Sequence, residues 1–165
     1  YIVIVKKKTA SLIAACCKSA ALLIDRDAEE KHRALDNYGL NFGIAFQIVD
    51  DYLDIMGDED SLGKALGQDI AMGEITLPVY DLFNSLGKKE RGELKQIILS
   101  RNINSEVIKK IRDKINRQKI SLRIKERILS YVCRSKHNLA RLKDSCFREK
   151  LMDLADYLVE RGFGV

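Results

Sequence analysis

FQIVDDYLD, residues 46–54, is the stretch that decides both the fold and the candidate site. In a helix that turns about 100° per residue, Gln47, Asp50, Asp51 and Asp54 fall within an arc of roughly 100° on one side. The apolar residues of the stretch fall on another side: Phe46, Val49 and Leu53. The pattern therefore predicts a helix that packs through one face and presents three carboxylates on the other.

The three aspartates are crowded at the carboxyl end of this predicted helix. Carboxylates there oppose the helix dipole, and neighbouring carboxylates resist ionisation unless a positive charge neutralises them. Mg²⁺ takes oxygen ligands and commonly bridges one or two carboxylates to substrate phosphates. We therefore predict that Asp50, Asp51 and Asp54 bind Mg²⁺ and, through it, a diphosphate. A solvated acidic helix end is the structural alternative.

A calcium-binding loop is a competing interpretation of the acidic stretch that follows. Asp58, Asp60 and Gly63 match the first, third and sixth positions of an EF-hand loop. Leu62 would then take the fifth position, which requires an oxygen ligand. Asp69 would take the twelfth, where a bidentate glutamate is needed. The sequence thus favours the aspartate helix as the metal site.

The pattern is helical from this segment outward to both ends of the chain. We expect the aspartate helix to be capped by Asp27 and to end at Gly57, with Gly39 and Gly43 allowing close approach of another helix. Residues 57–73 contain four glycines and are predicted as a loop. The other expected helices cover residues 1–24, a segment capped by Thr76 with Pro78 near its start, 88–99, 104–116, and 122–160 as one helix or two. No segment alternates apolar and polar residues for long enough to indicate a strand, so we predict an all-α fold, a helix bundle.

The composition is that of a globular protein, taken as one domain over residues 1–165. Hydrophobic residues make up 46% and charged residues 32%, and no apolar run reaches the roughly 18 residues of a membrane span. Residues 1–80 carry 8 Lys/Arg against 13 Asp/Glu, and residues 81–165 carry 21 against 11. The basic half suits nucleic acid, an anionic membrane surface or a solvated helix face. Because it lacks a helix-turn-helix pattern and an aromatic stacking platform, we expect no nucleic-acid binding.

The cysteines give no sign of a metal site. None lies in a C-x-x-C pair, and they are Cys16, Cys17, Cys133 and Cys146. The two histidines, His32 and His137, have no ligand-like spacing to them, so zinc is not expected. Buried or idle reduced thiols are predicted, and with them a cytoplasmic location.

Short motifs accompany the aspartate stretch in a definite order along the chain. They are Lys8-Thr9 before it, then Gly63-Lys64, Gly67-x-Asp69 and Gly73-x-x-Thr76-Leu77-Pro78 after it. With FQxxDDxxD as a second aspartate-rich motif, the set resembles the trans-prenyl diphosphate synthases, or polyprenyl synthetases, over essentially the whole chain. The ending, Leu154-Ala155-Asp156-Tyr157-x-Val159-x-Arg161, is similar to the tail of the long-chain, octaprenyl-type branch.

The resemblance implies an antiparallel helix bundle of the isoprenoid synthase type around a deep cavity, usually in a homodimer. The implied enzyme is a Mg²⁺-dependent trans-prenyltransferase that joins an allylic diphosphate to isopentenyl diphosphate, and its product can be delivered to a membrane. Carried over residue by residue, Asp50 and Asp51 become catalytic Mg²⁺ ligands, supported by Asp54. The implied contacts to the allylic diphosphate are Lys8, Thr9, Gln47 and Lys64, with Lys8 and Lys64 also catalytic.

Two departures from the family pattern affect these expectations. Glu74 stands where the family motif G-K-x-T-L-P has its lysine, which reverses a charge expected near diphosphate. The first aspartate-rich motif, which lies upstream of the Lys-Thr pair in the family, is missing, and the chain starts at Tyr1 without methionine. We therefore expect residues 1–165 to be the C-terminal portion of a synthase, inactive alone. A non-catalytic helical partner subunit of such a synthase is the alternative.

Overall fold

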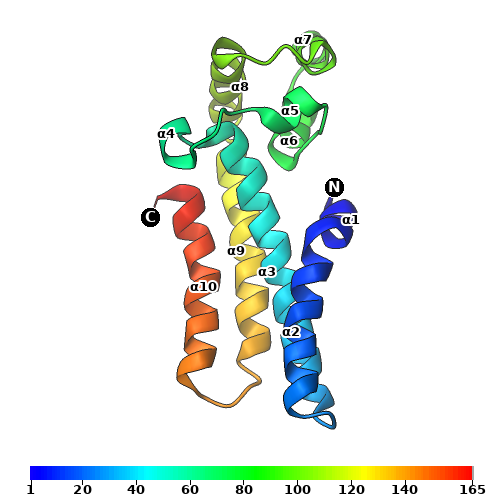
Figure 1. Cartoon of the computed structure of the whole chain (residues 1–165). Helices are drawn as coiled ribbons and strands as arrows, with labels where there is room; N and C mark the ends of the chain where they lie inside the picture. The colour runs from blue at the N-terminus through cyan, green and yellow to red at the C-terminus, as the bar shows by residue number, and fades with distance from the viewer. Residues whose placement is uncertain (165) are drawn as a thin grey trace. The chain divides into compact units, whose positions relative to one another are not determined.

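The computed structural model describes residues 1–164, and helices account for 81% of them. These residues contain no strand, which confirms the all-α prediction, and none of their helices is long and apolar enough to cross a membrane. The helices in Figure 1 are α1 (Ile2–Val5), the π-helix η1 (Lys6–Ala10), α2 (Ser11–Ile24), α3 (Glu29–Met56), α4 (Glu59–Leu62), α5 (Gln68–Met72), α6 (Leu77–Ser85), α7 (Lys88–Ser100), α8 (Ser105–Arg117), α9 (Ile120–Leu139) and α10 (Cys146–Phe163).

The chain forms two compact units, which are described separately. Residues 1–49 and 126–165 form unit 1, and residues 50–125 form unit 2. Helices α3 and α9 each contribute to both units, because each crosses a boundary between them. The assignment of residues 1–165 to one synthase domain stays a prediction.

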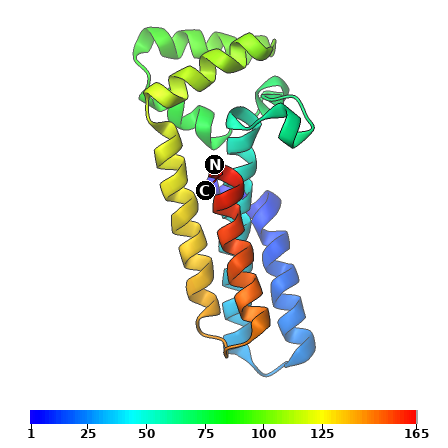
Figure 2. The same cartoon turned by 90° about the vertical axis from the view of Figure 1, so that its left-hand side faces the viewer.

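Unit 1 is a bundle in which α2, most of α3, most of α9 and α10 run side by side, as Figure 1 and Figure 2 show. Helices that follow one another in this bundle run in opposite directions. Gly39 of α3 faces α2, where an added Cβ would lie 2.7 Å from the Cα of Ala14, and Gly43 faces the end of η1, where an added Cβ would lie 2.7 Å from the Cα of Ala10. Because a side chain has no room there, the prediction that these glycines allow close helix approach is confirmed.

Helix α10 is held against α3 near both of its ends. The Tyr38 hydroxyl donates a hydrogen bond of 2.9 Å to the carbonyl of Leu151, and burial raises the pKa of this hydroxyl. Near the other end of α10, the Arg161 guanidinium lies 5.7 Å from the centre of the Phe46 ring. The two contacts fix the register of α10 on α3 within unit 1.

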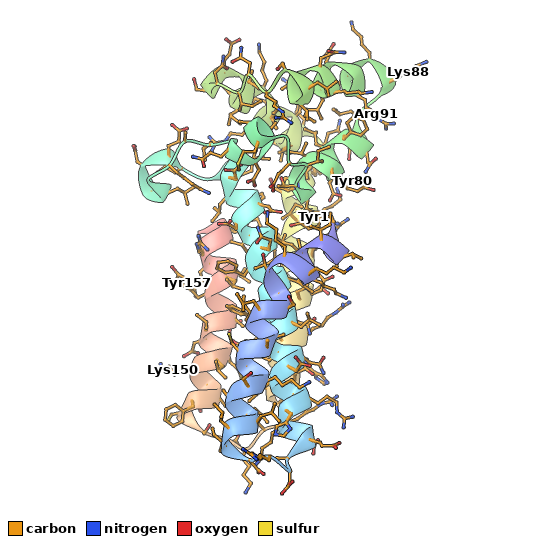
Figure 3. The ribbon with its side chains drawn as sticks, turned by 45° about the vertical axis from the view of Figure 1, so that its right-hand side comes forward. Tyr1, Tyr80, Lys88, Arg91, Lys150 and Tyr157 are labelled. Atoms are coloured by element: carbon orange, nitrogen blue, oxygen red, sulfur yellow. The ribbon has the colours of Figure 1, made fainter. Side chains whose placement is uncertain are left out.

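Unit 2 packs the short helices around an isoleucine- and leucine-rich core. Three buried isoleucines at helical spacing come from α8 and are Ile108, Ile111 and Ile115. Arg91 of α7, labelled in Figure 3, donates hydrogen bonds of 3.0 and 3.2 Å to the carbonyls of Phe83 and Leu86, and its guanidinium lies over the Phe83 ring. These contacts hold α7 against the end of α6.

Most predicted helix boundaries agree with the structure, but residues 1–24 form α1, η1 and α2 rather than one helix, and three further points differ. Helix α3 ends at Met56 as predicted, but it begins at Glu29, so Ala28 rather than Asp27 precedes its first residue. The loop predicted for residues 57–73 contains α4 and α5, because the glycines there end short helices rather than prevent them. Thr76 precedes α6 and Pro78 lies in its first turn as predicted, but the Thr76 side chain makes no capping hydrogen bond. The segment 122–160 forms two helices, α9 and α10.

All four cysteines are free thiols, as predicted, but none of them is buried. Cys16, Cys133 and Cys146 are exposed and Cys17 is half-buried. Burial, as the largest effect, raises the pKa of the Cys17 thiol. Of the two alternatives, buried or idle thiols, the structure therefore excludes burial, because α2, α9 and α10 turn these positions toward the surface.

Candidate functional site

The three aspartates at the end of α3 belong to unit 2, and two of them are buried. Asp51 is 3% exposed and Asp54 is 2% exposed, whereas Asp50 is half-buried. Burial disfavours an ionised carboxylate, and the nearby C-terminus of the helix disfavours it further. Carboxylates in this position therefore need compensating partners.

Asp54 is bound by the segment that follows α3. The backbone N–H of Asp69, in the first turn of α5, donates a hydrogen bond of 3.2 Å to Asp54 Oδ2, and Lys64 Nζ lies 3.9 Å from Oδ1. The N–H of Gly67 donates to the backbone carbonyl of Asp54 at 2.7 Å. Within residues 1–164, Oδ1 is buried and has no hydrogen-bond partner. One oxygen of this carboxylate is therefore available to a further ligand.

Asp69 lies in the same group of charges, although the sequence predicts it only as part of a motif. Its pKa is raised to about 6, mainly by burial and then by the negative charges of Asp54, Asp51 and Glu74. Lys64 opposes this shift only in part. Burial and the neighbouring carboxylates thus outweigh the effect of Lys64 on Asp69, and a positively charged ligand would relieve the repulsion among the carboxylates.

The residues present fit a hard divalent cation, but they supply only part of its coordination. The buried Asp54 Oδ1 is a suitable oxygen ligand, and the pKa of Asp69 is raised by burial first and then by the negative charges of Asp54, Asp51 and Glu74. In the described part of the chain, no group of three carboxylate, imidazole or thiol side chains is arranged to hold a metal ion by itself. Mg²⁺ commonly combines one or two carboxylates with water and substrate phosphates. The protein would thus provide part of the coordination and the diphosphate would provide more.

Two further candidates, Thr9 and Gln47, lie together in unit 1. The Thr9 hydroxyl donates a hydrogen bond of 2.7 Å to Gln47 Oε1 and so joins η1 to α3. Lys8 is the neighbour of Thr9 in η1 and is exposed. π-Helical turns are rare and often occur at functional sites. The sequence does not reveal η1, because one widened turn barely changes the spacing of apolar residues.

The structure therefore brings the predicted residues together as two groups. Asp50, Asp51, Asp54 and Lys64 are in unit 2, and Lys8, Thr9 and Gln47 are in unit 1. That both groups bind one ligand stays a prediction, as does the expectation that the aspartates face a cavity near Lys8.

The all-helical fold matches solved polyprenyl synthases and is therefore of the isoprenoid synthase type. The chain belongs to the polyprenyl synthetase family, whose model matches residues 1–115. Membership confirms the resemblance at the level of the family.

Known relatives extend the match to nearly the whole chain. The short chain isoprenyl diphosphate synthase of Methanothermobacter thermautotrophicus is 37% identical over 161 residues, which are 98% of this chain and 49% of the relative. The crystal structure of a polyprenyl synthase from Caulobacter crescentus CB15, complexed with calcium and isoprenyl diphosphate, matches with a TM-score of 0.90 at 32% identity, over 98% of this chain and 49% of that chain. A decaprenyl diphosphate synthase from Rhodobacter capsulatus matches with a TM-score of 0.86 at 30% identity, over 98% and 50%. The chain thus spans about half the length of the relatives it matches.

Proposed function

We propose that this chain carries the part of a polyprenyl synthetase that binds the diphosphate of an allylic substrate through Mg²⁺. The observation that carries the proposal is the buried Asp54 carboxylate, whose Oδ1 has no hydrogen-bond partner within residues 1–164. A buried acceptor without a partner is costly, and a bound cation would remove that cost. The relative that is complexed with calcium and isoprenyl diphosphate supports the same class of ligand here.

In the complete enzyme, the proposed reaction transfers the allylic group to isopentenyl diphosphate. The allylic C–O bond breaks and releases diphosphate, a C–C bond forms with the isopentenyl double bond, and a proton is lost. When bound, Mg²⁺ would neutralise the negative charge that develops on the departing diphosphate. Asp50, Asp51 and Asp54 would provide its carboxylate ligands.

The other candidates would bind and orient the diphosphate. Lys8 and Lys64 would act as point charges for phosphate oxygens, and Thr9 and Gln47 would contribute hydrogen bonds. The Lys64 side chain is 38% exposed and lies 3.9 Å from Asp54 Oδ1. It can therefore shift from the carboxylate to a phosphate oxygen without losing its place beside the site.

The finer properties of the complete enzyme are also proposals. From the ending Leu154 to Arg161 we infer that the chain belongs to the long-chain branch, and we infer a cytoplasmic homodimer whose product is delivered to a membrane. The relatives include a short chain synthase and a decaprenyl synthase, so the assignment to the long-chain branch rests on the ending alone. Chromatographic analysis of the products made by the complete enzyme would test this assignment.

The central test is calorimetric titration of inorganic diphosphate into the 165-residue chain with and without Mg²⁺. We expect binding that requires Mg²⁺ and that weakens about tenfold in Asp54→Asn, because a metal ligand is lost. Asp60→Asn is the matched control, since Asp60 is an exposed acid of α4. Diphosphate binding that is insensitive to both Mg²⁺ and Asp54→Asn would contradict the proposal.

A second candidate function, a non-catalytic partner subunit, is favoured by Glu74. This exposed acid adds negative charge to the site, as its effect in raising the pKa of Asp69 shows. In a diphosphate-binding chain, Glu74→Lys should strengthen Mg²⁺-dependent binding severalfold, because it replaces repulsion with attraction. Glu93→Lys makes the same charge change on the exposed surface of α7 and is the control. A partner subunit with no diphosphate site would show no binding in any of these variants.

A further inference from the structure

Arg112 of α8 contacts the end of α3 from far along the chain. Its Nε donates a hydrogen bond of 2.6 Å to the carbonyl of Ile55, and its Nη2 donates to the carbonyl of Gly57. Carbonyls at the end of a helix have no partner within the helix itself. The guanidinium therefore caps α3 directly after the aspartates and places positive charge at the negative end of the helix dipole.

The same face of α8 also supports the segment that binds Asp54. Ile108 lies one helical turn before Arg112, on the same side of α8. An added Cβ on Gly67 would lie 2.3 Å from Ile108 Cδ1, so the two residues are in close contact. Gly67 is the residue whose N–H donates to the Asp54 carbonyl. One face of α8 thus holds both segments that meet at Asp54.

We propose that Arg112 is a positioning residue for the aspartate site. It acts through the backbone, by fixing the last turn of α3 relative to the segment that carries Gly67 and Asp69. A guanidinium suits this task because its planar fork presents several donors in a fixed geometry, so one side chain can serve two carbonyls. A lysine would present a point charge and would hold the two carbonyls less precisely.

The first test measures amide hydrogen exchange by NMR at Gly67 and Asp69, the two amides that donate to Asp54. In Arg112→Met we expect exchange at both amides to accelerate about tenfold more than at the core residue Ile115, because a local anchor is lost. Arg112→Lys should restore part of the protection. Arg117→Met, on the exposed surface of the same helix, is the matched control and should leave both amides unchanged.

The exchange experiment distinguishes a positioning role of Arg112 from a purely stabilising one. A purely stabilising role would accelerate exchange at Ile115 as much as at Gly67 and Asp69, and that result would overturn the proposal. Should Arg112→Met fail to fold, the comparison of Arg112→Lys with the wild-type chain gives the same decision. Unchanged protection at Gly67 and Asp69 in Arg112→Lys would then count against positioning.

The second test is the titration of inorganic diphosphate with Mg²⁺, and this readout rests on the proposed function. Arg112→Met should weaken binding about fivefold, with partial recovery in Arg112→Lys, because the aspartates lose their fixed geometry. Wild-type affinity in Arg112→Met would overturn the positioning role. If the wild-type chain itself fails to bind diphosphate, the proposed function fails, and the amide exchange still decides the role of Arg112.

Discussion

The backbone N–H of Asp69 donates a hydrogen bond of 3.2 Å to Asp54 Oδ2, which brings together two carboxylates that are 15 residues apart in the sequence. The contact stabilises the Asp54 carboxylate but places the Asp69 side chain in its electric field. Burial, and then the charges of Asp54, Asp51 and Glu74, raise the pKa of Asp69 to about 6. The pair therefore links the geometry of the site to a measurable dependence of stability on pH.

Asp69→Asn should stabilise the Mg²⁺-free chain at neutral pH. The pKa of Asp69 is raised from 3.8 to about 6 in the folded chain. The contribution of protonated Asp69 to stability is therefore fully present below pH 3.8 and is lost as the pH rises through about 6. Because the side chain is only partly buried, we expect a gain of about 1–2 kcal/mol in unfolding free energy above pH 6. Urea unfolding at pH 5, 6 and 7.5 would measure it.

Asp60→Asn is the control for this experiment. It removes an exposed carboxylate from α4 in the same unit. It should change the unfolding free energy by less than about 0.5 kcal/mol at each pH. An equal effect of both variants would mean that general charge repulsion, rather than the surroundings of Asp69, causes the pH dependence.

Gly67→Ala should destabilise unit 2. Gly67 has a φ of 74°, and an added Cβ would lie 2.3 Å from Ile108 Cδ1 and 2.8 Å from Ile103 Cγ2. Backbone strain and overpacking together should cost about 2–3 kcal/mol in unfolding free energy. The comparison variant is Gly92→Ala, since nothing lies within 4 Å of its added Cβ in α7. Gly92→Ala should raise the unfolding free energy by about 0.5–1 kcal/mol. If urea unfolding shows that both variants change the unfolding free energy in the same direction, the explanation for Gly67 is contradicted.

Sequence reasoning predicted the fold class and the aspartate helix because both depend on local patterns. The spacing of Phe46, Val49 and Leu53 against the aspartates is set by helix geometry alone, and Gly57 marks the end of α3 at Met56 as expected. Helix existence and most boundaries followed from the same periodicity. The two short helices α4 and α5 were missed, because glycines suggest a loop even where they only terminate single helical turns.

The supporting contacts of the site could not be predicted, because they join residues far apart in the sequence. Arg112 lies 57 residues after Ile55, and no pattern in α8 distinguishes it from the other basic residues there. Asp69 was noticed only within a glycine motif, since the cause of its raised pKa is burial beside other carboxylates. The π-helix η1 was missed for a related reason, because its wider turn depends on backbone hydrogen bonds rather than on residue type.

Unit 1 exposes apolar side chains on α2, and we expect the chain to associate with itself through them. Leu12 is 68% exposed, and Leu23 and Ile24 are each 86% exposed. Exposed apolar side chains of this size favour association. Light scattering at micromolar concentration should therefore show an assembly larger than a monomer. The double variant Leu23→Glu, Ile24→Glu should shift it toward the monomer, whereas Ser130→Glu, on the exposed face of α9, should not. A monomeric wild-type chain would contradict this prediction.

The last prediction is that the 165-residue chain, tested alone, binds diphosphate with Mg²⁺ but shows no measurable prenyl transfer. The resemblance to trans-prenyl diphosphate synthases implies that two facing aspartate-rich motifs act on the leaving diphosphate. This chain contains one pair of adjacent aspartates, Asp50 and Asp51, and it spans about half of its relatives. Charge-assisted hydrogen bonds from Lys64 can still hold the anion, so binding should survive where turnover does not. The assay is incorporation of labelled isopentenyl diphosphate with an allylic primer and Mg²⁺. Robust turnover would show that one aspartate cluster suffices. The premise that turnover needs two facing aspartate-rich motifs would then be wrong.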